Sequence, residues 1–431
     1  MRKLLVIAFH YPPDNSSTGV LRTLKFTQYL RGRGWASHVV SVPPERYLSL
    51  DDRLAQQIPP ETPVTRVWAP DLSKSLAVWG RYPGFAAFPD RYWPWLFPAV
   101  RAGLRIVRES GADAIFATSP TPTALWIGMR LKARTGLPLI IDFRDPWVDN
   151  ATPPVRRFFE AWLERRFMRN ADRVICNTPA LRRDFVARYP EVPAERFVVI
   201  TNGYDERDFA GLKATPSKHF EIIYAGMLQK AHRNPEPLLR GVRLALDRGW
   251  LDAATLRLSF LGTDHWGASE EFLGRLRELG LRELTEVMAE RIPYGDALER
   301  LAAASVLLVL LHGEGNDDQV GRNREWWGLT VPAKVYEYLR VGRPMLVVVD
   351  EGAVAELLRE TGGGVPTPPH DIERIATSLR DLYAQWLAGE STRRTEVPPS
   401  VTKYSRESLA GQLADELEVI CRQPAGAEIA S

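Results

Sequence analysis

Short apolar runs of strand length alternate with helical patterns along most of this 431-residue chain. In the first half, the apolar runs lie at 4–9, 38–42, 114–117, 137–142, 173–176 and 197–201. Helical stretches separate several of them, at 21–33, 124–135 and 156–170. Strands that alternate with helices in this way form a parallel sheet with helices on both faces. We therefore predict an α/β fold of the doubly wound type.

A second series of the same kind follows a polar segment at 211–218, whose glycine, proline and serine are typical of a linker. Its predicted strands lie at 221–226, 256–262, 285–290, 306–311 and 345–350. The chain exceeds what one hydrophobic core organises, so two domains of about 200 residues each are expected. We predict Rossmann-like domains at 1–210 and 219–405 that face a central cleft. A C-terminal helix and tail at 406–431 can pack on either half.

Composition narrows the classes of function. The net charge of +3 is too small for a nucleic-acid-binding protein, which needs a concentrated basic face. Cys176 and Cys421, the only cysteines, exclude a four-cysteine zinc site and suit a reducing compartment. The apolar run at 4–9 is too short for a secretory signal, and no stretch of about 18 apolar residues spans a membrane. We expect a cytoplasmic protein, with peripheral attachment to the inner face of the cell membrane left open.

Residues 331–350, VPAKVYEYLRVGRPMLVVVD, predict a short turn, a helix and then a buried strand. Lys334 and Glu337 lie three residues apart and therefore share one face of that helix. A cation at the start of a helix suits a diphosphate, and a carboxylate accepts hydrogen bonds from ribose hydroxyls. The pattern is that of a nucleotide-sugar site.

Polar residues also follow two predicted strands of the first half. A loop rich in proline, aspartate, asparagine and serine leads through Gly19 into a helix, where the backbone can approach an anion. The alternative for this loop is an ordinary connection. Asp142, Arg144 and Asp145 lie at the end of the strand at 137–142, where ligands bind in α/β folds. They either contact a ligand or form an ion pair between Arg144 and one of the two aspartates.

Loops at the strand ends of the second half carry further candidates. Basic residues ahead of a helix can neutralise a diphosphate, and the loops at 260–265 and 290–296 are expected to line the same cleft. The candidates are one glycine, three basic residues and two members of the later loops: Gly226, Lys230, His232, Arg233, Thr263 and Ile292.

An aromatic insert at about 71–98 stands out within the first half. Its part Trp79–Phe97 holds eight aromatic residues, and arginines at 101, 105 and 108 follow on one helical stripe. Aromatic and arginine side chains together dock at lipid headgroups or stack on sugar rings, and an insert buried against the first half has the same pattern. A polar loop at 313–328 is a further candidate, because loops of this length are uncommon without a function or disorder.

Taken together, these motifs resemble the GT-B glycosyltransferases, and particularly the large retaining family 4. The resemblance covers nearly the whole chain and rests on four segments in order: YPPDNSSTGVLR, NGYDERDF, YAGMLQKAHRNPEPLL and VPAKVYEYLRVGRPML. The pairing of DFRDPW with PAKVYEYL is similar to a subgroup found in bacterial surface-polysaccharide gene sets.

The resemblance implies transfer of a sugar from a nucleotide diphosphate sugar to a glycan or lipid-linked glycan, with retention of configuration and without an obligatory metal or other cofactor. It implies that the second half binds the donor and the first half the acceptor. It places Glu337 on the ribose, the region 230–233 on the diphosphate and Gly19 near the reacting carbon. The donor-binding set is then Gly19, Gly226, Lys230, Arg233, Thr263, Ile292, Lys334 and Glu337, and the catalytic set is Asp142, Arg144 and Asp145.

The chain departs from the family pattern at three positions. Leu329 stands where members often carry a first glutamate, and Met227 where an arginine commonly follows the strand-end glycine. The usual histidine of the first half has no clear match, and Arg144 with Asp145 occupies roughly its place. Two rival functions therefore stay open: a non-catalytic GT-B scaffold or partner subunit, and a nucleotide-sugar epimerase.

Overall fold

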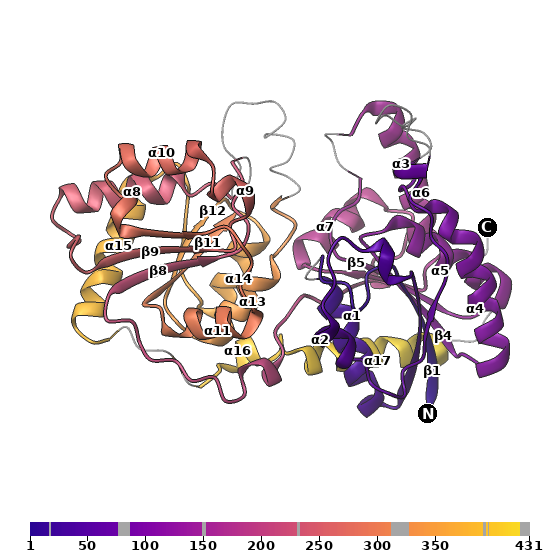
Figure 1. Cartoon of the computed structure of the whole chain (residues 1–431). Helices are drawn as coiled ribbons and strands as arrows, with labels where there is room; N and C mark the ends of the chain where they lie inside the picture. Colours follow the sequence, from indigo (N-terminus) through magenta and orange to yellow (C-terminus); the bar gives the residue numbers. More distant parts are fainter. Residues whose placement is uncertain are drawn as a thin grey trace. The chain divides into compact units, whose positions relative to one another are not determined.

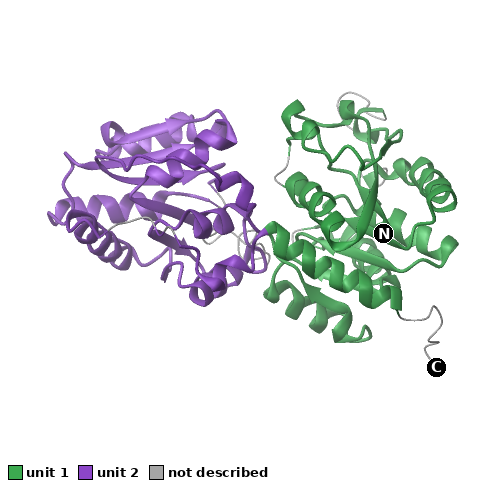
Figure 2. Cartoon of the chain, turned by 90° about the horizontal axis from the view of Figure 1, so that it is seen from below, with its two compact units in different colours: residues 1–202, 406–431 green, residues 203–405 purple. Residues whose placement is uncertain are grey.

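The chain folds into two units, which Figure 2 shows in different colours. One unit comprises Met1–Asn202 and the C-terminal part of the chain from Arg406, and the other comprises Gly203–Ser405. The computed structural model describes residues 1–16, 19–75, 87–148, 152–230, 233–311, 327–390, 394 and 396–422.

Among its described residues, the first unit forms a seven-stranded parallel sheet in the order β3-β2-β1-β4-β5-β6-β7. The strands are β1 (Arg2–Ala8), β2 (Trp35–Ser41), β3 (Val64–Arg66), β4 (Ala114–Thr118), β5 (Leu139–Phe143), β6 (Arg173–Cys176) and β7 (Phe197–Val199). The direction of winding reverses between β1 and β4, which is where doubly wound sheets bind ligands at their carboxyl ends.

Helices cover both faces of this sheet (Figure 1). The crossover helices and the returning C-terminal helix are α1 (Gly19–Tyr29), α2 (Asp52–Gln56), α3 (Leu72–Ser75), α4 (Leu96–Ser110), α5 (Pro122–Thr135), α6 (Pro154–Asn170), α7 (Pro179–Arg188) and α17 (Arg406–Arg422). Leucines of α17 share one buried cluster with α1 and β1, so the last helix completes the core of the first unit.

The second unit repeats the design with a six-stranded parallel sheet among its described residues, in the order β10-β9-β8-β11-β12-β13. The strands are β8 (Phe220–Ala225), β9 (Leu256–Leu261), β10 (Thr285–Met288), β11 (Val306–Leu311), β12 (Met345–Val349) and β13 (Pro366–Thr367). The helices are α8 (Glu236–Asp247), α9 (Asp264–Gly267), α10 (Glu270–Glu278), α11 (Tyr294–Ala303), α13 (Ala333–Val341), α14 (Ala353–Thr361), α15 (Ile372–Leu387) and α16 (Pro399–Thr402). α8 and α15 pack together in the main hydrophobic cluster of this unit.

The two units divide at Asn202, ahead of the polar segment at 211–218. The Tyr204 backbone N–H donates to the Tyr404 carbonyl at 3.2 Å, and Glu206 forms an ion pair with Arg340 of α13 at 2.7 Å. These bonds hold the residues that follow Asn202 in the second unit. Backbone pairing with a segment 200 residues further along the chain leaves no local signal in the sequence.

The aromatic insert is partly described. Trp79, Tyr82 and Phe85 lie outside the described residues, as does most of the polar loop at 313–328. Trp95 is completely buried and packs edge-on against Phe9 with ring centroids 5.6 Å apart, so this residue of the insert belongs to the core, whereas Phe97 is exposed. No helix in the described part of the chain has the length and apolar character needed to span a membrane.

Candidate functional site

In the second unit, Gly226 and Lys334 lie against one another at the end of β8. The Lys334 ammonium donates to the Ala225 carbonyl at 2.8 Å and lies 3.8 Å from the centroid of the Tyr224 ring. Gly226 has φ +128°, and a Cβ built on it would lie 2.7 Å from Lys334 Nζ. A side chain at position 226 would therefore be strained in its backbone and would displace the ammonium.

α13 is held in place from the same strand end. It begins at Ala333 after Pro332, whose extended backbone precedes the helix. The Tyr338 hydroxyl accepts a hydrogen bond from the Ala225 backbone N–H at 3.0 Å. Strand β8 and helix α13 thus meet through both Lys334 and Tyr338, one turn apart on the helix.

The surroundings of Lys334 disfavour its charge. Burial is the largest cause and repulsion from Arg233 adds to it, so the pKa of Lys334 lies well below its usual range although Glu337 acts in the opposite direction. A diphosphate brought to this ammonium would supply the negative charge that the site lacks. The arrangement can therefore bind an anion and take up a proton with it.

Of the remaining residues predicted to bind the donor, some lie near Lys334 and others do not. Arg233 lies close enough to Lys334 to lower its pKa, and its guanidinium lies 5.8 Å from the Trp327 ring. Glu337 accepts a hydrogen bond from the Tyr294 hydroxyl at 3.0 Å. Lys230 instead forms an exposed ion pair with Glu271 of α10 at 2.5 Å. His232 lies outside the described residues.

Thr263 and Ile292 occupy the loops that follow β9 and β10. Thr263 is buried: its N–H donates to the Met288 carbonyl at 3.0 Å, and its own carbonyl accepts from the Leu228 N–H at 3.1 Å. These bonds join three strand-end loops of the second unit. Ile292 is half-buried just after β10.

In the first unit, Asp142 at the end of β5 is fully buried in a hydrogen-bonded network. Its carboxylate accepts from Arg22 of α1 at 2.8 and 3.1 Å and from the Thr118 hydroxyl at 2.8 Å. Burial opposes its charge, but Arg22, Arg144 and Thr118 outweigh that cost and lower the pKa of Asp142. The arginine that hydrogen-bonds to Asp142 is Arg22, and not the neighbouring Arg144 considered from the sequence.

Arg144 is buried beside this network. Its side chain donates to the hydroxyls of Thr23 at 2.8 Å and Thr118 at 3.2 Å. Its Nη1 is buried and has no hydrogen-bond partner among the described residues. Burial lowers the pKa of Arg144 to about 10, opposed by the charges of Asp142 and Asp145. Arg144 thus has an unused hydrogen-bond donor, Nη1, at the carboxyl end of the sheet.

Two further predicted residues are close in the chain to members of this network. Asp145 is half-buried directly after Arg144 and acts on its charge. Gly19 is the first residue of α1, the helix that carries Arg22 and Thr23. The structure therefore brings the start of α1 and the end of β5 together through side chains of both.

A histidine–aspartate pair at the end of β1 is absent from the sequence-based predictions. His10 Nδ1 lies 2.6 Å from Asp14 Oδ2, and the buried Asp14 also accepts from the backbone N–H of Ser16 at 2.8 Å and from its hydroxyl. Burial opposes the charge of Asp14, but these hydrogen bonds outweigh it and its pKa is lowered. The position of His10 directly after a predicted strand is a signal that could have identified it.

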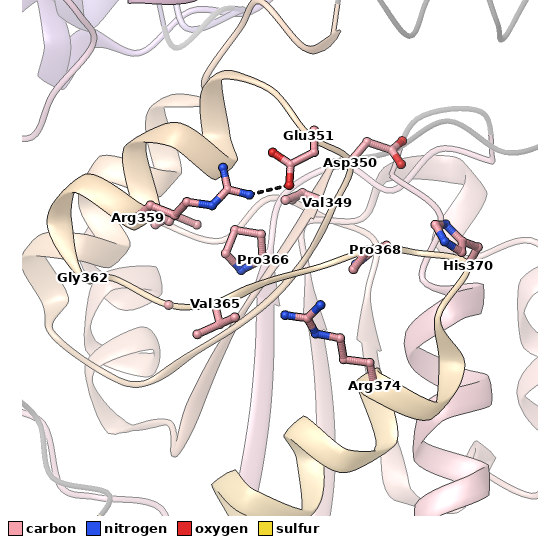
Figure 3. A pocket seen from close by; sticks show the side chains of 12 residues that line it. Val349, Asp350, Glu351, Arg359, Gly362, Val365, Pro366, Pro368, His370 and Arg374 are labelled. Carbon is pink, nitrogen blue, oxygen red and sulfur yellow. Dashed lines mark hydrogen bonds and ion pairs between the residues drawn. The ribbon is translucent and has the colours of Figure 1, made fainter.

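The second unit also has a pocket of about 540 Å³ beside β12 and β13 (Figure 3). Val349 and Pro366 are among the residues that line it, as are Glu351 and Arg359, which form an ion pair. None of the predicted donor-binding residues lines it. No cluster of three or more histidine, cysteine or carboxylate side chains suited to a metal occurs in the described part of the chain.

Comparison with protein families gives one match, to a glycosyl transferase 4-like domain over residues 19–203. No curated protein sequence matches the chain.

Several solved structures match the chain over nearly its whole length. A glycosyltransferase from Rickettsia africae has a TM-score of 0.68 at 11% identity, with 98% of this chain and 99% of that chain covered. HepE of Anabaena in complex with UDP has a TM-score of 0.66 at 15% identity, with 97% and 100% covered. Sucrose-phosphate synthase of Thermosynechococcus elongatus has a TM-score of 0.65 at 15% identity, with the same coverage.

Proposed function

We propose that this chain is a glycosyltransferase that uses a nucleotide diphosphate sugar, on the premise that residues 19–203 match a glycosyl transferase 4-like domain and that the whole chain has the two-domain GT-B fold. The observation that carries the proposal is the pairing of Gly226 with Lys334, which places a partly buried lysine amine at a strand end beside a residue that has no side chain of its own. The HepE structure, which contains UDP, supports the same class of donor.

In this proposal the second unit binds the donor. Lys334 and Arg233 neutralise the diphosphate, and Glu337, oriented by Tyr294, accepts hydrogen bonds from the ribose. When the bond between the anomeric carbon and the diphosphate breaks, these cations stabilise the charge on the departing nucleotide. Fixed groups that stabilise developing charge usually contribute most of the rate enhancement in an enzyme. No obligatory metal is required.

The first unit binds the acceptor, for which we propose a glycan or lipid-linked glycan of cell-surface polysaccharide biosynthesis. Arg144 offers an unused N–H group, and His10, fixed by Asp14, offers Nε2 to an acceptor hydroxyl. The family resemblance supports retention of anomeric configuration.

Replacement of Arg144 or Asp145 by alanine is expected to lower turnover and to spare nucleotide binding. Turnover at the wild-type level in both variants would contradict the proposed roles of these two residues.

Thermal unfolding with UDP, GDP, dTDP, ADP and NAD tests the donor class. A ligand at about 100 times its Kd stabilises a protein by about 2.7 kcal/mol, which raises Tm by a few degrees. A shift with one nucleoside diphosphate is expected and identifies the base. A shift with NAD alone would contradict the proposal.

The corresponding nucleotide sugar then separates the rival functions. A transferase releases nucleotide and forms a product whose amount depends on an added acceptor. Nucleotide binding without any turnover would indicate a scaffold, and an epimer or free nucleotide formed without acceptor would indicate an epimerase. The anomeric proton coupling of the product reports retention or inversion directly.

A further inference from the structure

Helix α6 carries a row of large apolar side chains that point away from the core. Val155, Phe158, Phe159 and Trp162 are 74%, 68%, 50% and 49% exposed. Thirteen large apolar side chains are exposed among the described residues, and these four lie within eight consecutive positions. Their spacing of three, one and three residues places them on one face of the helix.

The opposite face of α6 is the one that packs on the first unit. Leu163, Phe167 and Met168 are buried against the first unit. Both acidic residues of the helix also face inward, where Glu160 pairs with Arg156 at 2.7 Å and Glu164 pairs with Arg188 of α7 at 3.0 Å. The outward row is therefore not needed to hold the helix on its sheet. An exposed apolar row of this kind marks a surface that contacts something else.

The exposed charges on α6 itself are of one sign. Because Glu160 and Glu164 are buried, the exposed ionic side chains of α6 are arginines, at positions 156, 165, 166 and 169. The Arg166 guanidinium lies 4.9 Å from the Trp162 ring, at the point where the apolar part of the row meets the basic part. Arg165 also pairs with Glu191 at 3.2 Å, and Arg156 pairs with Glu160, so two of these four charges are offset.

The aromatic rings of the row are held by contacts with one another. Phe158 and Phe159 pack edge to face with centroids 5.5 Å apart. Phe88, from the aromatic insert, packs edge to face on Phe159 at 6.1 Å. The insert thereby supports the row, which limits the side-chain entropy that binding would remove.

We propose that the outward row of α6 docks the first unit on an anionic lipid surface. Its phenylalanine and tryptophan rings enter the boundary between headgroups and acyl chains, and its arginines contact lipid phosphates, as in helices that lie in a membrane interface. Charge complementarity selects this occupant, since aromatic rings on a helix whose exposed ionic side chains are all arginines match a surface that is apolar below and negative above. The proposal stands independently of the proposed sugar transfer.

Co-sedimentation of the full chain with vesicles tests the proposal. One set of vesicles contains phosphatidylcholine alone and the other an equal mixture with phosphatidylglycerol. We expect the chain to sediment with the anionic vesicles, and the double variant Phe158→Ala, Trp162→Ala to lose about tenfold or more of this binding. Replacement of Arg165, Arg166 and Arg169 by glutamate should abolish the preference for anionic vesicles.

The matched control replaces two exposed apolar residues elsewhere in the first unit, Leu48 and Trp68, by alanine; they are 82% and 66% exposed. This variant is expected to bind vesicles as the wild type does. Because all substituted side chains are exposed, far-ultraviolet circular dichroism should show unchanged folding. The proposal is overturned if the wild type binds neither kind of vesicle, or if both double variants lose binding to the same extent. It is also overturned if light scattering detects a dimer of the wild type that the variant Phe158→Ala, Trp162→Ala no longer forms.

Discussion

At the scale of single residues, the proposed donor site depends on the absence of a side chain at Gly226. Gly226 combines a backbone angle that other residues rarely adopt with a close approach to Lys334. The second feature distinguishes it from glycines that serve a turn alone. Gly249, for example, also has positive φ, at +66°, but a Cβ there would meet nothing within 4 Å.

We predict that Gly226→Ala weakens binding of the nucleoside diphosphate by at least about tenfold, because the methyl group strains the backbone and displaces the ammonium. Isothermal titration calorimetry measures this affinity. Gly249→Ala is the matched control, since it adds the backbone strain without the contact and should bind as the wild type does. Equal losses in the two variants would mean that the contact with Lys334 is irrelevant to binding.

The lowered pKa of Lys334 predicts a pH dependence of the same binding. The ammonium is charged below its folded pKa, so affinity for a diphosphate should fall as the pH rises through that value, which lies below the usual 10.5. Lys334→Met should bind weakly with this dependence removed. Lys218→Met, which replaces an exposed lysine of the same unit, serves as control. A wild-type affinity that is constant up to the usual lysine range would refute the prediction.

At the scale of elements, α17 is the helix whose position the sequence left open. Leu409, Leu413 and Leu417 are at most 1% exposed and share a cluster with Leu24 and Leu30 at the other end of the chain. The first unit therefore lacks part of its core until the end of the chain has folded back. Strands β3 and β13 are also missing from the predicted set, because three and two residues are too few to show an apolar pattern.

We predict that Leu413→Ala destabilises the first unit by about 2–5 kcal/mol, through lost burial and the cavity left behind. Urea unfolding followed by tryptophan fluorescence measures the change. Val419→Ala on the same helix is the control, because Val419 is 40% exposed and its replacement should cost much less. Similar unfolding midpoints for the two variants would show that α17 adds little to the core.

At the scale of the whole molecule, two buried carboxylates make the stability of the first unit sensitive to acid. The pKa values of Asp14 and Asp142 are both lowered in the folded chain. A lowered folded pKa means that the unfolded chain binds protons first as the pH falls. The stabilisation is therefore complete above about pH 4, the unfolded value, and is lost progressively below it.

We predict that the urea midpoint of the wild type falls steeply as the pH is lowered below about 4, and that Asp142→Asn flattens this dependence. At neutral pH the same variant should be less stable by about 3–5 kcal/mol, because it leaves the buried charge of Arg22 unpaired. Midpoints measured along a pH series give both effects. An acid dependence that is identical in the two proteins would contradict the assignment to Asp142.

The comparisons and the two sheets confirm the predicted GT-B fold, and local patterns were enough for that because each strand and helix repeats its apolar period within a few residues. The adjacency of Lys334 and Glu337 on one helical face follows from the sequence for the same reason. Only the tertiary structure decided that Asp142 pairs with Arg22, 120 residues away, that α17 completes the first unit, and that the apolar row of α6 faces outward. These outcomes depend on which strand ends and helix faces the folded chain brings together, and a local period carries no information about them.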